Sequence, residues 1–309
     1  MNKDILHLLA CPMTGLGLYN GYRGNAWYKY RIEIFNKYTL KSLLNQTNRD
    51  FVLWIAVRFE EKNNPLTMEW IKYLRTIPNL NFIFTYGGCF FWDDKYKEDN
   101  LAERLKVILP QLKTIYVGEK YVYETIQPSD DFYHTKEVEE IQKVPYKERR
   151  ILLHRKGYVM NSTTQELADW NPTTINPPFY TTMYPADTFF DARKHFDYLK
   201  GSKSHEDVAW LFDPVYMPDY RYCVLTHGNQ ISTTWYHPYR EGRYKWEPSH
   251  AILKEFGIDS EKPSEIKVKV FQAGKMIRYF VYRILIRGQV YRILKIIKNK
   301  YELTTRDNR

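Results

Sequence analysis

Cysteines and long apolar runs are scarce in this chain. Its 309 residues include three cysteines, Cys11, Cys89 and Cys223, which lack the paired spacing of a zinc site or a disulfide scaffold. The longest apolar stretches, such as Phe51 to Val57, are far shorter than the roughly 20 residues that cross a bilayer, and no charged-then-apolar leader opens the chain. We therefore expect a cytoplasmic protein without a membrane span or an export signal.

Excess charge is also missing from most of the chain. The net charge is +10, from 46 basic and 36 acidic residues. Residues 266–309 hold 12 basic residues against two acidic ones, so they alone carry +10 and residues 1–265 carry zero. This distribution predicts a neutral folded domain, 1–265, followed by a cationic tail, 266–309.

The apolar pattern of the first 131 residues predicts strands that alternate with helices. The expected strands are Ile5 to Ala10, Phe51 to Val57, Leu80 to Tyr86 and Val117 to Ile126, and the expected helices are Arg31 to Asn45, Thr67 to Ile77 and Leu101 to Leu112, the last stopping near Pro110. This order is typical of an α/β fold with a mostly parallel sheet flanked by helices. Further along the chain the pattern is less regular, and we interpret Trp170 to Pro185 as an extended loop over a cleft.

Two acidic side chains follow a predicted strand in the segment Pro128-Ser129-Asp130-Asp131. Ligands of open α/β sheets bind at the carboxyl ends of strands, so this pair is placed to hold a divalent cation against a phosphate. A solvated turn or a helix cap is the alternative, because proline, serine and aspartate favour both. Asp93-Asp94 is a rival pair, but its neighbours are charged and favour a solvated loop.

Two later segments also carry candidate side chains. Glu206 and Asp207 precede an apolar helix start, where they would either cap the helix or accept a proton from a substrate hydroxyl. His227 follows an apolar run and precedes Gly228, which suits a metal ligand as well as a purely structural histidine. Spacing alone leaves these alternatives open.

The N-terminal segment adds a resemblance to a known family. Tyr30-Arg31-Ile32-Glu33-Ile34-Phe35, Gln46-Thr47 and Asp50-Phe51-Val52-Leu53-Trp54-Ile55 resemble the signature of a rhamnosyltransferase family of family 2-like glycosyltransferases. The resemblance spans roughly residues 5–240 and is strongest at 28–57. It implies a GT-A-type nucleotide-sugar-binding fold, with a nucleotide-binding half at 1–131 and an acceptor-binding half at 132–265. It also implies a nucleoside-diphosphate-sugar donor, with rhamnose as the candidate sugar, a glycan or lipid-linked acceptor, and Mn or Mg as the divalent metal.

The same resemblance implies roles for individual residues. The metal would be held by Asp130, Asp131 and His227. The donor nucleotide would lie near Thr14, Arg31, Arg58 and Asp130. In an inverting transfer Asp207 would act as the base and Glu206 would orient the acceptor.

The cationic tail contains no acidic residue between positions 275 and 300. Its periodicity predicts two amphipathic helices with a break near Gly288. Their basic sides would comprise Lys275, Arg278, Arg283 and Arg287, then Arg292, Lys295 and Lys298. Such helices suit an anionic membrane surface and would place the protein on the inner face of a membrane, and packing on the body or on a second copy is the alternative.

Two other classes of function compete with a glycosyltransferase. A metal-dependent nuclease or phosphotransferase could use the same carboxylates, but the neutral body does not favour nucleic acid as a partner. A noncatalytic glycan-binding protein would explain the aromatic content of 17%.

Overall fold

The computed structural model describes residues 3–14, 23–87, 98–171, 179–201, 207–228 and 243–287. The chain divides into two compact units, Met1–Ser260 and Glu261–Arg309.

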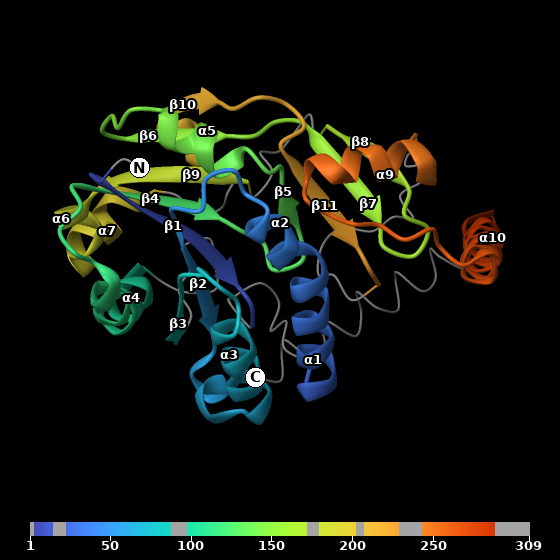
Figure 1. Cartoon of the computed structure of the whole chain (residues 1–309), viewed down its shortest axis with the longest axis horizontal. Coiled ribbons are helices and arrows are strands. Elements are labelled where there is room, and N and C mark those ends of the chain that lie inside the picture. Colours follow the sequence, from blue (N-terminus) through green and yellow to red (C-terminus); the bar gives the residue numbers. More distant parts are fainter. Residues whose placement is uncertain are drawn as a thin grey trace. The chain divides into compact units, whose positions relative to one another are not determined.

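A seven-stranded sheet forms the centre of the first unit (Figure 1). Its strands, in spatial order, are β10 (Asp213–Tyr216), β6 (Arg150–Leu153), β9 (Tyr180–Pro185), β4 (Tyr121–Ile126), β1 (Ile5–Pro12), β2 (Val52–Val57) and β3 (Phe82–Tyr86). Only β9 runs antiparallel to its neighbours among these strands. The predicted fold class, α/β with a mostly parallel sheet flanked by helices, is confirmed.

A second, four-stranded sheet belongs to the same unit. Its strands, in spatial order, are β5 (Phe132–Tyr133), β11 (Tyr222–Thr226), β7 (Gly157–Asn161) and β8 (Leu167–Trp170). The short strand β5 follows β4 along the chain after a turn at residues 127–131, so this turn connects the two sheets.

Helices cover both faces of the large sheet. The helical segments, in chain order, are α1 (Asn25–Ile34), a π-helical segment (Phe35–Thr39), α2 (Leu40–Leu44), a 3-10 turn (Phe59–Asn63), α3 (Pro65–Arg75), α4 (Glu98–Leu112), a second 3-10 turn (Lys113–Ile115), α5 (Glu137–Lys143), α6 (Ala186–Phe189), α7 (Ala192–Leu199), α8 (Val208–Leu211) and α9 (Trp246–Glu255). The second unit contributes α10 (Glu265–Arg287).

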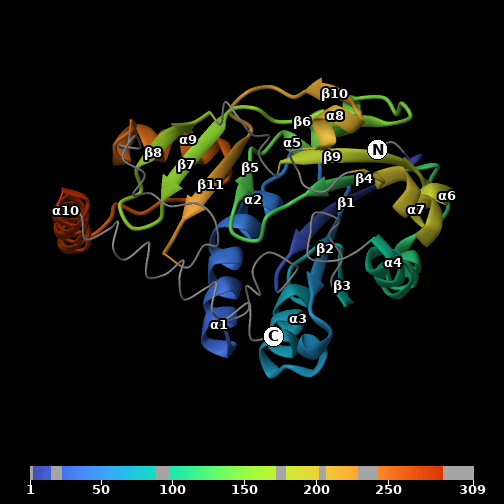
Figure 2. The ribbon, with the colours of Figure 1, turned by 180° about the vertical axis from the view of Figure 1, so that it is seen from behind.

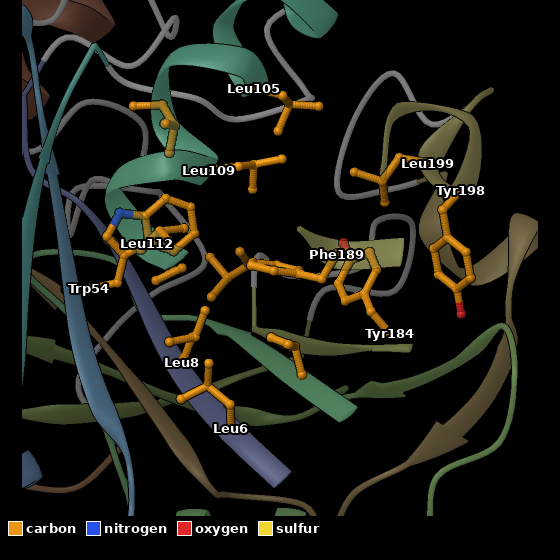
Figure 3. Close-up of a cluster of buried hydrophobic side chains, with 14 of the residues drawn as sticks. Leu6, Leu8, Trp54, Leu105, Leu109, Leu112, Tyr184, Phe189, Tyr198 and Leu199 are labelled. Atoms are coloured by element: carbon orange, nitrogen blue, oxygen red, sulfur yellow. The ribbon is translucent and has the colours of Figure 1, made fainter. Parts of the chain in front are cut away.

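The side chains of β1 alternate between two apolar layers, because successive residues of a strand point to opposite faces. Leu8 lies in a cluster with α4 and α7, and Leu9 lies in another with α1, α2 and α3. To the first cluster, shown in Figure 3, α4 contributes Leu105, Leu109 and Leu112, and α7 contributes Tyr198 and Leu199. Burial on both faces explains the apolar run that predicted this strand.

Most predicted elements agree closely with the structure, but two predicted segments do not. The first helix begins at Asn25, earlier than the predicted Arg31. The segment Trp170 to Pro185 was expected to be a loop, and this is wrong, because Tyr180–Pro185 forms β9 between β4 and β6. Pro185 is the last residue of β9, where a missing backbone N–H is tolerated. Strand β10 and helix α9 were not predicted.

Candidate functional site

The candidate site lies where β4 and β11 end. The turn after β4 contains Ser129, Asp130 and Asp131, and His227 directly follows β11. Helix α1 supplies Arg31. Figures 1 and 2 both show α1 beside the end of β11, and the hydroxyl of Tyr30 donates a hydrogen bond of 3.0 Å to the backbone carbonyl of His227.

The guanidinium of Arg31 joins this turn to the end of β11. Its Nη1 lies 2.5 Å from Oδ2 of Asp130 and 3.2 Å from Nε2 of His227, and its Nη2 donates to Oγ of Ser129. The ring of Trp27, one helical turn before Arg31, lies 5.7 Å from the guanidinium carbon, a distance typical of a cation–π contact. Arg31 is only 4% exposed, so its charge is held in a largely dry environment.

Asp130 is the anion of the cluster. Its Oδ2 also lies 3.0 Å from Nε2 of His227, and the imidazole is covered by the ring of Tyr30 with 5.5 Å between ring centroids. Burial alone would raise the pKa of Asp130, but the charge of Arg31 and the hydrogen bond from His227 hold that pKa well below its usual range. Asp130 is therefore ionised at neutral pH and fixes the cation and the imidazole in one place.

Asp131 points elsewhere. Its Oδ1 accepts a hydrogen bond of 2.9 Å from the backbone N–H of Leu225 in β11, and its backbone carbonyl accepts one of 2.8 Å from the hydroxyl of Thr39. Burial, and then the neighbouring charge of Asp130, raise the pKa of Asp131 well above its ordinary value. The pKa values of the two adjacent carboxyl groups are thus shifted in opposite directions, and Asp131 ties the turn to β11.

Asp130, Asp131 and His227, which were expected to hold a metal, contact other groups of the protein in this arrangement. Oδ2 of Asp130 is engaged by Arg31 and His227, and Asp131 is engaged by the backbone of β11. Within the described ranges no group of three or more histidine, cysteine, aspartate or glutamate side chains could hold a metal ion. A guanidinium occupies the position beside Asp130 in which the sequence had suggested a metal cation.

Thr14 and Arg58 form a second pair at the carboxyl ends of β1 and β2. The backbone N–H of Arg58 donates a hydrogen bond of 3.1 Å to Oγ1 of Thr14. The guanidinium of Arg58 makes an ion pair of 2.8 Å with Glu61, which is itself 2% exposed. Thr14 and Arg58, two of the four residues predicted near the nucleotide, therefore lie at the end of the sheet that binds ligands in α/β folds.

Asp207 is not brought together with Arg31, Asp130 and His227. It caps the short helix α8, where its backbone carbonyl accepts from Trp210 at 3.0 Å, and α8 leads into the amino end of β10. Strand β10 runs parallel to β4. The amino end of β10 and the carboxyl end of β4 therefore lie at opposite ends of the strands of this sheet. Glu206, and the rival pair Asp93-Asp94, lie outside the described residues.

The predicted basic residues of the tail are described in part. Lys275 and Arg278 lie on α10, and Arg283 and Arg287 belong to its last turns. Arg292, Lys295 and Lys298, and the expected break near Gly288, lie outside the described residues.

Sequence reasoning missed the roles of three side chains: Trp27 and Ser129 contact the guanidinium of Arg31, and Tyr30 contacts His227. The spacing of Trp27 and Arg31, one turn apart on a helix, was the available signal. It was overlooked because the helix was expected to begin at Arg31.

Comparison with known proteins gives only distant similarities. No family model matches the chain, and no curated protein matches it. Among solved structures, the inositol-1-phosphate CTP transferase from T. maritima is similar at 12% identity and a TM-score of 0.36, covering 84% of this chain and 100% of that one. The 4-diphosphocytidyl-2C-methyl-D-erythritolsynthase from Anaerococcus prevotii DSM 20548 is similar at 12% identity and a TM-score of 0.34, covering 81% and 94%. Likeness at this level carries no argument about function, so the site has to be judged on its own geometry.

Proposed function

We propose that this chain is a glycosyltransferase that moves a sugar from a nucleoside-diphosphate sugar to a glycan or lipid-linked acceptor. The observation that carries the proposal is the convergence of Arg31, Asp130 and His227, which are 99 and 97 residues apart along the chain. They meet at the carboxyl ends of strands, where α/β folds bind nucleotides. The resemblance of residues 28–57 to a rhamnosyltransferase family, which includes Arg31, supports the same class, with rhamnose as the candidate sugar.

Arg31 is the group we assign to the donor diphosphate. Sugar transfer leaves negative charge on the departing nucleoside diphosphate, and a fixed cation in a dry site stabilises that charge. A guanidinium suits this task because its planar set of N–H donors matches phosphate oxygens. Its Nε is buried and has no hydrogen-bond partner among the described residues.

Asp130 and His227 are positioning residues in this proposal. Oδ2 of Asp130 contacts both the guanidinium of Arg31 and the imidazole of His227. The hydroxyl of Tyr30 donates a hydrogen bond to the backbone carbonyl of His227 and so fixes its position. A preformed cation of this kind needs no reorganisation when charge develops on the donor. The divalent metal inferred from sequence stays a prediction, and no step above depends on it.

Nucleotide binding by the purified full chain tests the proposal. We would measure the melting temperature with a panel of nucleoside diphosphates and nucleotide sugars, once with EDTA and once with Mn²⁺. One nucleotide should stabilise the wild type, and Arg31→Lys, which keeps the charge but loses the planar fork, should weaken its binding by about 10- to 100-fold.

Arg193→Lys is the matched control, because Arg193 is exposed on α7 and pairs with Asp197 on the same helix. It should bind the nucleotide as the wild type does. If no nucleotide stabilises the wild type in either condition, or if Arg31→Lys folds and binds as tightly as the wild type, the proposal is wrong. A melting curve without nucleotide shows whether each variant is folded.

A further inference from the structure

Helix α10 combines strong positive charge with exposed apolar side chains. Its 23 residues contain six lysines and arginines, and Glu265 is the one acidic residue. Six apolar side chains on it are 47–74% exposed: Ile266, Val270, Met276, Ile277, Phe280 and Val281. Large apolar side chains gathered on one exposed surface indicate an interaction site.

Five of these six residues form a single stripe, and Met276 lies beyond one edge of it. At about 100° of rotation per residue Ile266, Val270, Ile277, Phe280 and Val281 fall within an arc of about 100°, the width of an apolar face on an amphipathic helix. By the same count Lys267 and Arg278 border the stripe on one side and Lys269 borders it on the other. All three basic side chains are exposed. The stripe is therefore flanked by cations along both edges.

The flanking charge decides which partner fits the stripe. A second copy of α10 would bring two sets of six like charges together, which opposes association. A nucleic acid would satisfy the charge but would leave the apolar stripe in water. An anionic lipid surface satisfies both, because apolar side chains enter the acyl boundary while lysine and arginine reach the headgroups on either side.

We propose that α10 binds in the plane of an anionic membrane, with the stripe of Ile266, Val270, Ile277, Phe280 and Val281 facing the lipid. Across the described parts of the chain no helix is long and apolar enough to cross a membrane, and this proposal requires only that α10 lie on one. It does not depend on the reaction proposed above. It would bring the protein to a surface that carries lipid-linked substrates.

Vesicle flotation of the full chain tests the proposal. We would compare vesicles of phosphatidylcholine alone with vesicles that contain one third phosphatidylglycerol. The wild type should float with the anionic vesicles and much less with the neutral ones. The double variant Ile277→Ser/Phe280→Ser should bind anionic vesicles at least about 10-fold more weakly, and Lys267→Gln/Lys269→Gln/Arg278→Gln about 100-fold more weakly.

Two controls match these variants outside α10. Val117→Ser removes an apolar side chain that is 88% exposed, and Arg193→Gln/Lys194→Gln removes two exposed charges of α7. Both should float as the wild type does. The proposal is overturned if the wild type does not float, or if Ile277→Ser/Phe280→Ser floats normally, which would mean adsorption by charge alone. A dimer that is lost in Ile277→Ser/Phe280→Ser would overturn it in favour of a second copy. Nucleotide binding measured on the same variants keeps this outcome separate from the proposed reaction.

Discussion

Glu124 of β4 gives the most quantitative test of this structure. Its side chain is buried in the strand next to Leu8 of β1, and Oε2 accepts a hydrogen bond of 3.1 Å from the hydroxyl of Tyr184. Burial raises its pKa to about 7, although the hydrogen bond from Tyr184 acts in the opposite direction. In the folded protein Glu124 is therefore protonated at mildly acidic pH.

The size of the effect follows from linkage. The pKa of Glu124 rises from 4.5 to about 7 on folding, and each pKa unit corresponds to about 1.4 kcal/mol. Below pH 4.5 the carboxyl is protonated in both the folded and the unfolded state, so burial of the neutral group costs no ionisation energy. As the pH rises towards 7 the unfolded state loses its proton first, so the free energy of unfolding falls by about 3 kcal/mol in total.

Urea unfolding of wild type and Glu124→Gln between pH 4.5 and 8.5 measures this difference. Glutamine has nearly the same shape, can still accept from Tyr184, and does not ionise. The variant should match the wild type near pH 4.5 and exceed it by up to about 3 kcal/mol at pH 8. Glu69→Gln, on the exposed face of α3, is the control. A stability difference between Glu124→Gln and wild type that does not change with pH would refute the reasoning, because Glu124 would then titrate alike in both states.

Two further predictions concern backbone and catalysis. Gly257 has a φ of +69°, and an added Cβ would meet Cβ of Asn45 at 2.4 Å, so Gly257→Ala should lower the free energy of unfolding by about 2 kcal/mol in urea titration. Because Asp207 precedes the amino end of β10, away from Arg31, Asp130 and His227, Asp207→Asn should keep donor binding and sugar transfer close to those of the wild type in a transfer assay. A loss of transfer of about 100-fold or more with unchanged donor binding would contradict this and would identify Asp207 as the base.

The strands of the large sheet differed in how well the sequence predicted them. Strands β1 and β2 were predicted because helices bury both of their faces and leave an apolar run. Strand β9 was misinterpreted because its threonines and Pro185 look like loop residues. Its threonines are buried by the neighbouring strands, as in the hydrogen bond of 2.6 Å between Thr125 and Thr181, and no local pattern records such a contact.

The candidate site could be predicted only as separate pieces. Asp130 and His227 were singled out because acidic and imidazole groups at strand ends often bind ligands. Their contact with Arg31 depends on how the four-stranded sheet packs against the turn after β4, which no spacing along the chain reveals. The different roles of Asp130 and Asp131 likewise follow from the turn, which directs one carboxyl to Arg31 and the other to Leu225.

The wide separation of Arg31, Asp130 and His227 along the chain also constrains how the site is built during synthesis. Residues 1–131 emerge from the ribosome with Arg31 and Asp130 but without β11, so the imidazole and the backbone N–H that holds Asp131 are still missing. Contacts between distant segments form late in folding, because closing a long loop costs entropy before the contact forms. The candidate site is therefore expected to be complete only after residue 227 has been made and β11 has joined the second sheet.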